Sequence, residues 1–189
     1  MEDGAATVFG GRADWAAANR EAVAAGLDWL AGRMRAEIDR PGAGEAPAEG
    51  DPARAAFEAA RAALREAGAP AAIDRVSGLF GLSPFDEDVL LLALAPRVEA
   101  GVEALCARLH DRAGLTWPTR HLALALLAGG ARGRAARRPA AGAPLRRWRL
   151  LEIADEGRGA LAGLALDERM AEPLLGRDRM DPRVAAGLR

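Results

Sequence analysis

Residues 79–96 read Leu-Phe-Gly-Leu-Ser-Pro-Phe-Asp-Glu-Asp-Val-Leu-Leu-Leu-Ala-Leu-Ala-Pro, and this stretch decides the fold because it joins two helices through a tight turn. Gly81 stands where a helix C-terminus favours a residue that tolerates a left-handed conformation. Ser83 is a good N-cap for the next helix, and Pro84 occupies the first position of that helix. Asp86 stands where a capping box has Glu or Gln, so the sequence predicts an imperfect box.

The second of these helices is predicted to be the central helix of the core. Its first turn carries Asp86, Glu87 and Asp88, and the helix dipole favours negative charge at that end. Residues 89–95 are all apolar, so a helix there must be buried on most of its sides. Pro96 is predicted to end the helix. No catalytic motif lies in this stretch or beside it.

Composition excludes several classes of function. The chain has 189 residues, half of them hydrophobic, and its formal net charge of -1 gives no general attraction to nucleic acids or anionic membranes. All 26 basic residues are Arg, and the abundance of Arg, Ala, Gly and Pro indicates a GC-rich genome, so arginine content alone is weak evidence for a binding site. A standard phosphate-binding loop requires Lys, so this chain is predicted not to be an enzyme.

The single cysteine and the hydropathy of the sequence predict a cytoplasmic protein that does not bind a membrane. Cys106 is the only cysteine, which excludes an intrachain disulfide and a cysteine zinc cluster. The N-terminal residues lack the basic and apolar regions of a signal peptide. No segment reaches the roughly 18 consecutive apolar residues that a membrane span needs.

The sequence divides into four segments. Residues 1–11 are predicted to be disordered, residues 12–40 to form an amphipathic helix, residues 41–52 to be a linker rich in Pro and Gly, and residues 53–189 to form a helical domain. The first helix has one narrow apolar stripe, made of Val23, Leu27, Leu30, Met34 and Ile38. Such a stripe is typical of a helix docked on its own domain, and a short coiled coil between chains is the alternative.

The order of elements in residues 53–189 predicts a fold. Helices are expected at 53–67, 70–80, 84–96, 97–111, 118–128 and 167–175. The helix 70–80 is expected to direct Ile73, Val76, Leu79 and Phe80 inward. Residues 145–154 are predicted to form a strand that pairs with 160–166 through a turn at 155–159, with a helix as the alternative for 160–166.

Helices followed by a hairpin predict a mainly α fold: a helical N-terminal segment plus a winged helix. In this interpretation the three-helix core consists of residues 84–96, 97–111 and 118–128. The β-hairpin wing spans about 145–166.

No group of residues predicts catalysis, a cofactor or a metal. His110 and His121 could approach each other, and with Asp111 they could bind zinc, but nothing in their spacing demands it. Cys106 has apolar neighbours and is interpreted as a buried hydrophobic residue, although His110 lies four positions further on. Gly157-Arg158-Gly159 is interpreted as the tip of the wing.

A basic run is the candidate surface for a partner or for nucleic acid. It comprises Arg132, Arg134, Arg137, Arg138, Arg146, Arg147 and Arg149. Winged helices with such a patch can contact DNA phosphates or an acidic protein. The expected third core helix, 118–128, is mostly Leu and Ala and offers only Arg120 and His121 to read bases, so a protein partner is favoured and a DNA-binding regulator is the alternative.

Several segments resemble the N-terminal winged-helix region of a family of bacterial AAA-type ATPases, some of which are encoded with extracellular contractile injection systems. Residues 80–96 carry most of the resemblance. Similar segments follow in the same order at 117–127, 143–151, 166–170, 174–176 and 180–184. The resemblance covers roughly residues 70–184.

The resemblance implies an ATPase module, with ATP and Mg²⁺, beyond these residues. No catalytic residue can be assigned in this chain, because the phosphate loop, the acidic metal-binding motif and the arginine fingers of that module are not among its residues. We therefore expect a non-catalytic recruiting or regulatory module. Its expected partners are its own ATPase module, an injection-system component or another substrate protein.

Overall fold

The computed structural model describes residues 11–39, 51–127, 143–154 and 156–177. These residues are mainly helical with one small antiparallel sheet, as the sequence predicts. The predicted disordered N-terminus and the predicted linker lie almost entirely outside the described residues. In the described part of the chain, no helix is both long enough and apolar enough to cross a membrane.

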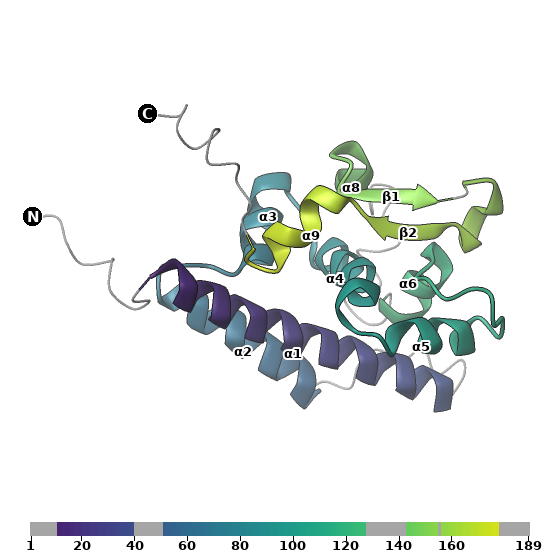
Figure 1. The fold of residues 1–189 in the computed structure, drawn as a ribbon, viewed down its shortest axis with the longest axis horizontal. Helices are drawn as coiled ribbons and strands as arrows, with labels where there is room; N and C mark the ends of the chain where they lie inside the picture. Colours follow the sequence, from purple (N-terminus) through teal and green to yellow (C-terminus); the bar gives the residue numbers. More distant parts are fainter. Residues whose placement is uncertain (1–10, 40–50, 128–142, 155, 178–189) are drawn as a thin grey trace, which may run out of the picture.

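Helix α1 (Arg12–Asp39) is the longest element, and α2 (Pro52–Glu66) runs back along it (Figure 1). The apolar stripe of α1 is buried: Val23, Leu27, Leu30 and Met34 are at most 4% exposed and share one core with α4. The interpretation of α1 as a helix docked on its own domain is therefore confirmed. The same burial leaves the stripe unavailable for a coiled coil between chains.

The turn between α3 (Ala72–Phe80) and α4 (Pro84–Val98) has the predicted caps. Gly81 is left-handed, with φ of 64°, and ends α3. The Ser83 hydroxyl accepts a hydrogen bond from the Asp86 amide at 3.2 Å, and Asp86 Oδ2 accepts one from the Ser83 amide at 3.0 Å. The capping box that the sequence predicts to be imperfect is therefore complete, with Asp in place of Glu.

Helix α4 is the centre of the core, and every residue from Phe85 to Ala95 is buried. The prediction that Pro96 ends this helix is wrong, because α4 continues to Val98. Proline removes one donor from the helix, yet the Glu99 amide donates to Ala95 O at 2.9 Å, so hydrogen bonding resumes beyond it. Around α4 lie α5 (Val102–Leu109) and α6 (Arg120–Leu127).

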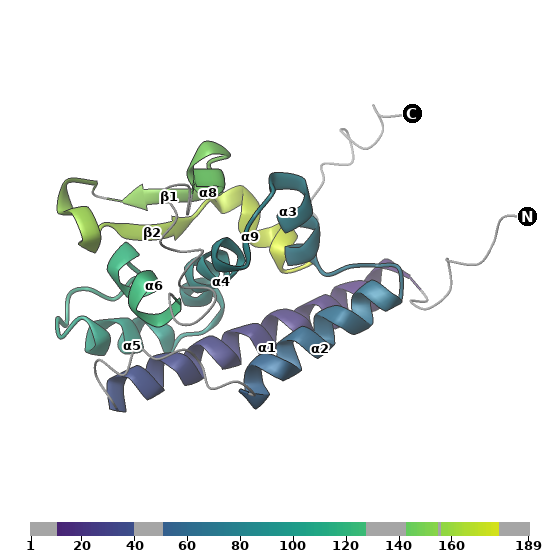
Figure 2. The same cartoon turned by 180° about the vertical axis from the view of Figure 1, so that it is seen from behind.

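Helix α5 is shorter than the predicted helix 97–111. Arg97 and Val98 belong to α4, and Glu99 then has extended backbone angles of -115° and 105° that separate the two helices. Together α4, α5 and α6 occupy the place expected of the three-helix core. Seen from behind, they lie between the α1–α2 pair and the hairpin (Figure 2).

The hairpin consists of β1 (Leu151–Ala154), the 3-10 helix η1 (Glu156–Leu161) and β2 (Gly163–Leu166). Its strands are antiparallel, with Leu151 opposite Leu166 and Ala154 opposite Gly163. The second strand is therefore a strand, and the helical alternative for it is wrong.

The first predicted strand is wrong over its first half, so the wing begins near residue 151 and not near 145. Residues Ala143–Arg147 form a helical turn, α8, closed by a hydrogen bond from the Trp148 amide to Pro144 O at 3.0 Å. Arg149 then takes a left-handed conformation, with φ of 51°. This geometry buries both Leu145 and Leu150, which an extended strand would place on opposite faces.

The segment before α6 attaches the hairpin to the helical core. Leu164 N donates to Pro118 O at 2.8 Å, and Thr119 forms an isolated bridge with Gly163. A side chain at Gly163 would meet Trp117, whose Cδ1 atom lies 2.8 Å from the position of an added Cβ. Glycine is required there because the indole packs directly on the strand.

Helix α9 (Glu168–Leu174) closes the fold against α1 and α3, and it confirms the predicted helix that Asp167 caps. The side chain of Asn19 joins the three helices. Its Nδ2 atom donates to Leu174 O at 2.9 Å, and its Oδ1 atom accepts from the Ala72 amide at 2.7 Å. The N-terminal helix is therefore an integral part of the domain.

Candidate functional site

The predicted basic run is only partly within the described residues. Arg132, Arg134, Arg137 and Arg138 lie outside them. Arg146 and Arg147 end α8, and Arg149 follows in the turn toward β1; all three are exposed. The structure therefore places three of the seven predicted arginines on one short turn.

The exposed indole of Trp148 is the centre of this turn. Half of Trp148 is exposed, and its ring centroid lies 5.7 Å from that of Phe80, at an interplanar angle of 51°. The Arg147 guanidinium lies 5.4 Å from the Trp148 centroid. The C-terminal end of α3 and the turn after α8 therefore build one surface, on the side of the molecule away from α1 and α2 (Figure 1).

Leu79, which precedes Phe80 in α3, is an exposed apolar side chain of this helix end. It is 76% exposed, so the prediction that it points inward is wrong. Ile73, Val76 and Phe80 follow one face of α3, whereas Leu79 lies on the same row as exposed Arg75, one turn before it. We use the term Trp148 surface for the set Leu79, Phe80, Arg146, Arg147, Trp148 and Arg149.

The arginines of the Trp148 surface have no carboxylate partner in the described part of the chain. None of the ion pairs there involves Arg146, Arg147 or Arg149. Their charges therefore face solvent beside an exposed aromatic ring. Arginine and Trp in this combination are frequent at the energetic centres of protein interfaces.

The described surface of α6 differs from that of a base-reading helix. Its Leu122, Ala123, Leu126 and Leu127 are buried, and Leu124 is 40% exposed. Besides Leu124, the exposed positions are Arg120, His121 and Ala125. Polar side chains are thus confined to the first turn, whereas base recognition uses several along one face.

The two histidines are close enough to affect each other. Burial is the main cause that lowers the pKa of His110; a hydrogen bond with the Trp117 backbone opposes it, and the charges of His121 and Arg112 add to it. No three His, Cys, Asp or Glu side chains within the described ranges are grouped so that they could hold a metal ion.

Cys106 is fully buried, as predicted for a small hydrophobic residue. Burial, and secondarily the charge of Glu103, raises the pKa of its thiol to about 12. The thiol therefore stays protonated at neutral pH, and a thiol is a poor nucleophile.

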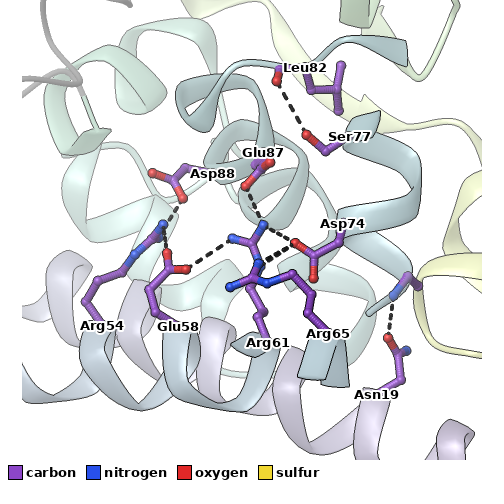
Figure 3. A network of polar contacts seen from close by, with 11 residues as sticks. Asn19, Arg54, Glu58, Arg61, Arg65, Asp74, Ser77, Leu82, Glu87 and Asp88 are labelled. Carbon is purple, nitrogen blue, oxygen red and sulfur yellow. Dashed lines mark hydrogen bonds and ion pairs between the residues drawn. The ribbon is translucent and has the colours of Figure 1, made fainter. Parts of the chain in front are cut away.

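Sequence reasoning missed a buried ionic network, which Figure 3 shows between α2, α3 and α4. Arg54 Nη1 lies 2.6 Å from Asp88 Oδ1, and Arg61 Nη2 lies 2.9 Å from Glu87 Oε2. Arg61 Nε also donates to Asp74 Oδ1 at 3.0 Å. The acidic first turn of α4 therefore binds α2, beyond the dipole interaction that the sequence predicts.

The environment of this network keeps Arg61 charged. Desolvation by itself would lower the pKa of Arg61, but the hydrogen bond to Asp74 and the charges of Glu87, Asp74 and Glu58 outweigh it and raise the pKa. The Arg54 guanidinium also lies 4.4 Å from the ring centroid of Trp29. These contacts fix the start of α4 and serve the stability of the fold rather than chemistry.

One sequence signal could have revealed the network. The buried positions of α2 are Arg54, Phe57, Arg61 and Leu64, so two arginines occupy the apolar stripe of an amphipathic helix. Charged side chains on a buried stripe require charged partners, and the acidic run after Ser83 supplies them.

The family of the chain follows from its sequence as a whole. Residues 13–188 match the family described as winged helix domain, variant. No curated protein and no solved structure matches the chain. The matched range includes α1 to α9, which agrees with a three-helix core joined to a β-hairpin. The chain therefore belongs to the variant winged-helix family.

Proposed function

We propose that this winged-helix chain is a non-catalytic module that binds a partner protein on behalf of an AAA-type ATPase. The observation that carries the proposal is the Trp148 surface, where an exposed indole lies beside arginines that form no ion pair with any described carboxylate, and where α3 adds an exposed leucine. Winged helices serve both DNA binding and protein interaction, and this combination of side chains suits a protein.

The link to an ATPase rests on the resemblance of residues 70–184 to the N-terminal regions of such enzymes. ATP and Mg²⁺ belong to the ATPase module of the proposed parent protein, since this chain contains no Lys for a standard phosphate loop. In the proposed arrangement the winged helix positions a cytoplasmic ATPase on its target. That target is an injection-system component or another substrate protein.

Two observations favour a protein over DNA as the partner. The net charge of -1 provides no general attraction to phosphates, on which most non-specific DNA affinity depends. The exposed face of α6 carries Leu124 and Ala125 where a recognition helix would present polar side chains.

The proposal is tested in a parent protein that carries both this region and an ATPase module. Deletion of residues 1–189 should leave basal ATP hydrolysis intact and abolish binding to the proteins encoded beside the ATPase gene. Binding that survives the deletion would refute the proposal.

A mobility shift with duplex DNA at about 0.15 M salt tests the alternative. We expect no shift with the chain alone. A shift that weakens steeply with added salt would instead indicate a DNA-binding regulator.

A further inference from the structure

We infer that the Trp148 surface is a docking site for an acidic segment of a partner protein, in which carboxylates flank an apolar side chain. This inference rests on the proposed function, because it specifies the chemistry of the partner that the module binds. It combines three features of the surface: exposed apolar area, a preorganised aromatic ring, and positive charge that pairs with no carboxylate of the described residues.

The apolar part of the site is exposed to an unusual degree. Leu79 is 76% exposed and Trp148 is 50% exposed, whereas the leucines of α4 are buried. An apolar side chain of a partner that covered them would gain roughly 25 cal/mol for each Å² removed from water. Phe80 packs against the indole at an interplanar angle of 51°, so an incoming group would contact a formed platform.

The platform is held by the backbone as well as by ring contacts. Trp148 N donates to Pro144 O at 3.0 Å, and Leu150 N donates to Leu145 O at 2.9 Å. Leu145 and Leu150 are both buried, which anchors the turn on either side of the indole. Because the ring is positioned before a partner arrives, binding loses little conformational entropy at this residue.

The charges of the site select an acidic partner. Arg146, Arg147 and Arg149 lie within four positions of one turn, and no carboxylate pairs with them among the described residues. Guanidinium groups bind carboxylates through paired hydrogen bonds, and exposed positive charges accelerate the approach of an acidic segment. A partner with carboxylates beside its apolar anchor satisfies both parts of the surface.

The same surface suits nucleic acid less well. Single-stranded nucleic acids bind through successive bases stacked on several aromatic rings in a basic groove. Of the rings assigned to the Trp148 surface, Trp148 is the one that is exposed, and the exposed side chain of Leu79 offers no stacking face. A protein segment uses the leucine and the indole together, so a protein is the occupant to which we commit.

The first experiment measures binding of the whole chain to a fluorescently labelled peptide of Asp and Glu around a central Leu-Leu pair. The same peptide with Asn and Gln in place of the acidic residues is the neutral probe. We expect the acidic peptide to raise fluorescence anisotropy and its affinity to fall with added salt. Equal binding of the two peptides, or no binding of the acidic one, would overturn the inference.

Charge reversal then locates the binding. The variant R146E/R147E/R149E should weaken binding of the acidic peptide by about tenfold or more. Its matched control, R20E/R35E/R108E, reverses the same number of exposed arginines elsewhere and should leave binding unchanged. An equal loss in the control would show attraction by overall charge and would overturn the inference.

A second pair of variants tests the apolar part without changing charge. L79A/W148A should weaken peptide binding by about tenfold, whereas L124A, which removes an exposed leucine of α6, should not. Both variants should keep the helical circular dichroism of the parent chain. A site that tolerates L79A/W148A is not an apolar docking site.

Competing occupants give distinct results. A single-stranded DNA oligonucleotide that displaces the peptide and binds more tightly would assign the surface to nucleic acid. Concentration-dependent self-association that disappears in L79A/W148A would assign it to a second copy of the chain. Either result would overturn the inference.

The test within the parent ATPase separates this inference from the proposed function. If R146E/R147E/R149E keeps partner binding while deletion of residues 1–189 abolishes it, the docking site is wrong and the module proposal stands. If neither change affects partner binding, both are wrong. If both R146E/R147E/R149E and the deletion abolish partner binding, the result supports the docking site and the module proposal.

Discussion

Replacing Arg61 with Met should destabilise the protein strongly, because this guanidinium joins three helices. It extends from α2 to Asp74 of α3, with Nε to Oδ1 at 3.0 Å, and to Glu87 of α4, with Nη2 to Oε2 at 2.9 Å. The Arg61 side chain is 6% exposed. Met keeps much of the length of Arg and removes its charge.

The expected loss follows from what the substitution leaves behind. Removing one partner from a buried ion pair costs about 3–5 kcal/mol, because the remaining charge is buried and uncompensated. Asp74 keeps Arg65, whose Nη1 atom lies 3.0 Å away, whereas no other ion pair in the described part of the chain holds Glu87. We therefore expect a loss near the lower limit, about 3 kcal/mol.

The control is R65M, which removes a guanidinium from the same carboxylate at the surface. The Arg65 side chain is 47% exposed, against 6% for Arg61, and exposed ion pairs contribute about 0–1 kcal/mol. Urea unfolding followed by circular dichroism measures both free energies. With a slope of about 1–3 kcal/mol per molar urea, the R61M midpoint should fall by about 1–3 M and that of R65M far less.

Two results would refute the reasoning. The first is a loss for R61M no larger than that for R65M, which would mean that the network contributes little to stability. The second concerns the double variant R61M/E87M, in which no carboxylate is stranded at Glu87. It should recover part of the stability lost in R61M, since replacing both partners of a buried pair with apolar groups is often neutral. If R61M/E87M recovers no stability, the loss in R61M does not come from the stranded carboxylate of Glu87.

Three further predictions concern single residues. The pKa of His110 is lowered below 6.5 in the folded state, so near this pH the unfolded chain binds more protons than the folded chain. The free energy of unfolding should therefore rise as the pH increases toward 6.5. In urea titrations at several pH values, H110Q should flatten this dependence. Gly163→Ala should lose about 1–3 kcal/mol against Trp117 in thermal unfolding, whereas Gly32→Ala, with open space around it, should gain up to about 1 kcal/mol. Cys106 should resist iodoacetamide at pH 7 in the folded protein and react promptly in urea, and rapid reaction of the folded protein would contradict its burial.

The sequence predicts α4 well because local signals suffice there. A cap, a first-turn proline and an unbroken apolar run together define a buried helix, whatever surrounds it. The stripe of α1 is equally local, since spacing of three and four marks one face of a helix. These elements needed no knowledge of distant contacts.

The turn of α8 and the network were missed for different reasons. Residues 145–150 have the apolar and Arg-Trp content of a strand. Only the burial of Leu145 and Leu150 against the core selects a helical turn there, with Arg149 in a left-handed conformation. Sequence reasoning assigned no role to the arginines of α2, because charged residues are usually exposed and Arg is abundant throughout the chain. Burial of Arg54 and Arg61 depends on α4, which follows later in the chain.

The candidate site was predicted in part. The basic run pointed to Arg146, Arg147 and Arg149, but no sequence pattern connects them to Phe80, which comes from α3. The sequence predicts Leu79 to be in the core because it is apolar and lies three positions after Val76, which is the spacing of one helix face. Surfaces made from two separate segments require the fold before they can be recognised.

The hydrogen bonds of Asn19 have a consequence for how the domain assembles. Its bond to Leu174 O spans 155 positions, so it forms only after the first and last described helices have met. Closing a loop of this length costs conformational entropy, so the Asn19–Leu174 hydrogen bond should form late in folding. Contacts between residues so far apart in the sequence also slow folding. The amide of Ala72, which donates to the same side chain, should exchange its hydrogen with solvent only when the whole domain opens. This amide therefore reports whether Asn19 of α1 stays docked at the start of α3.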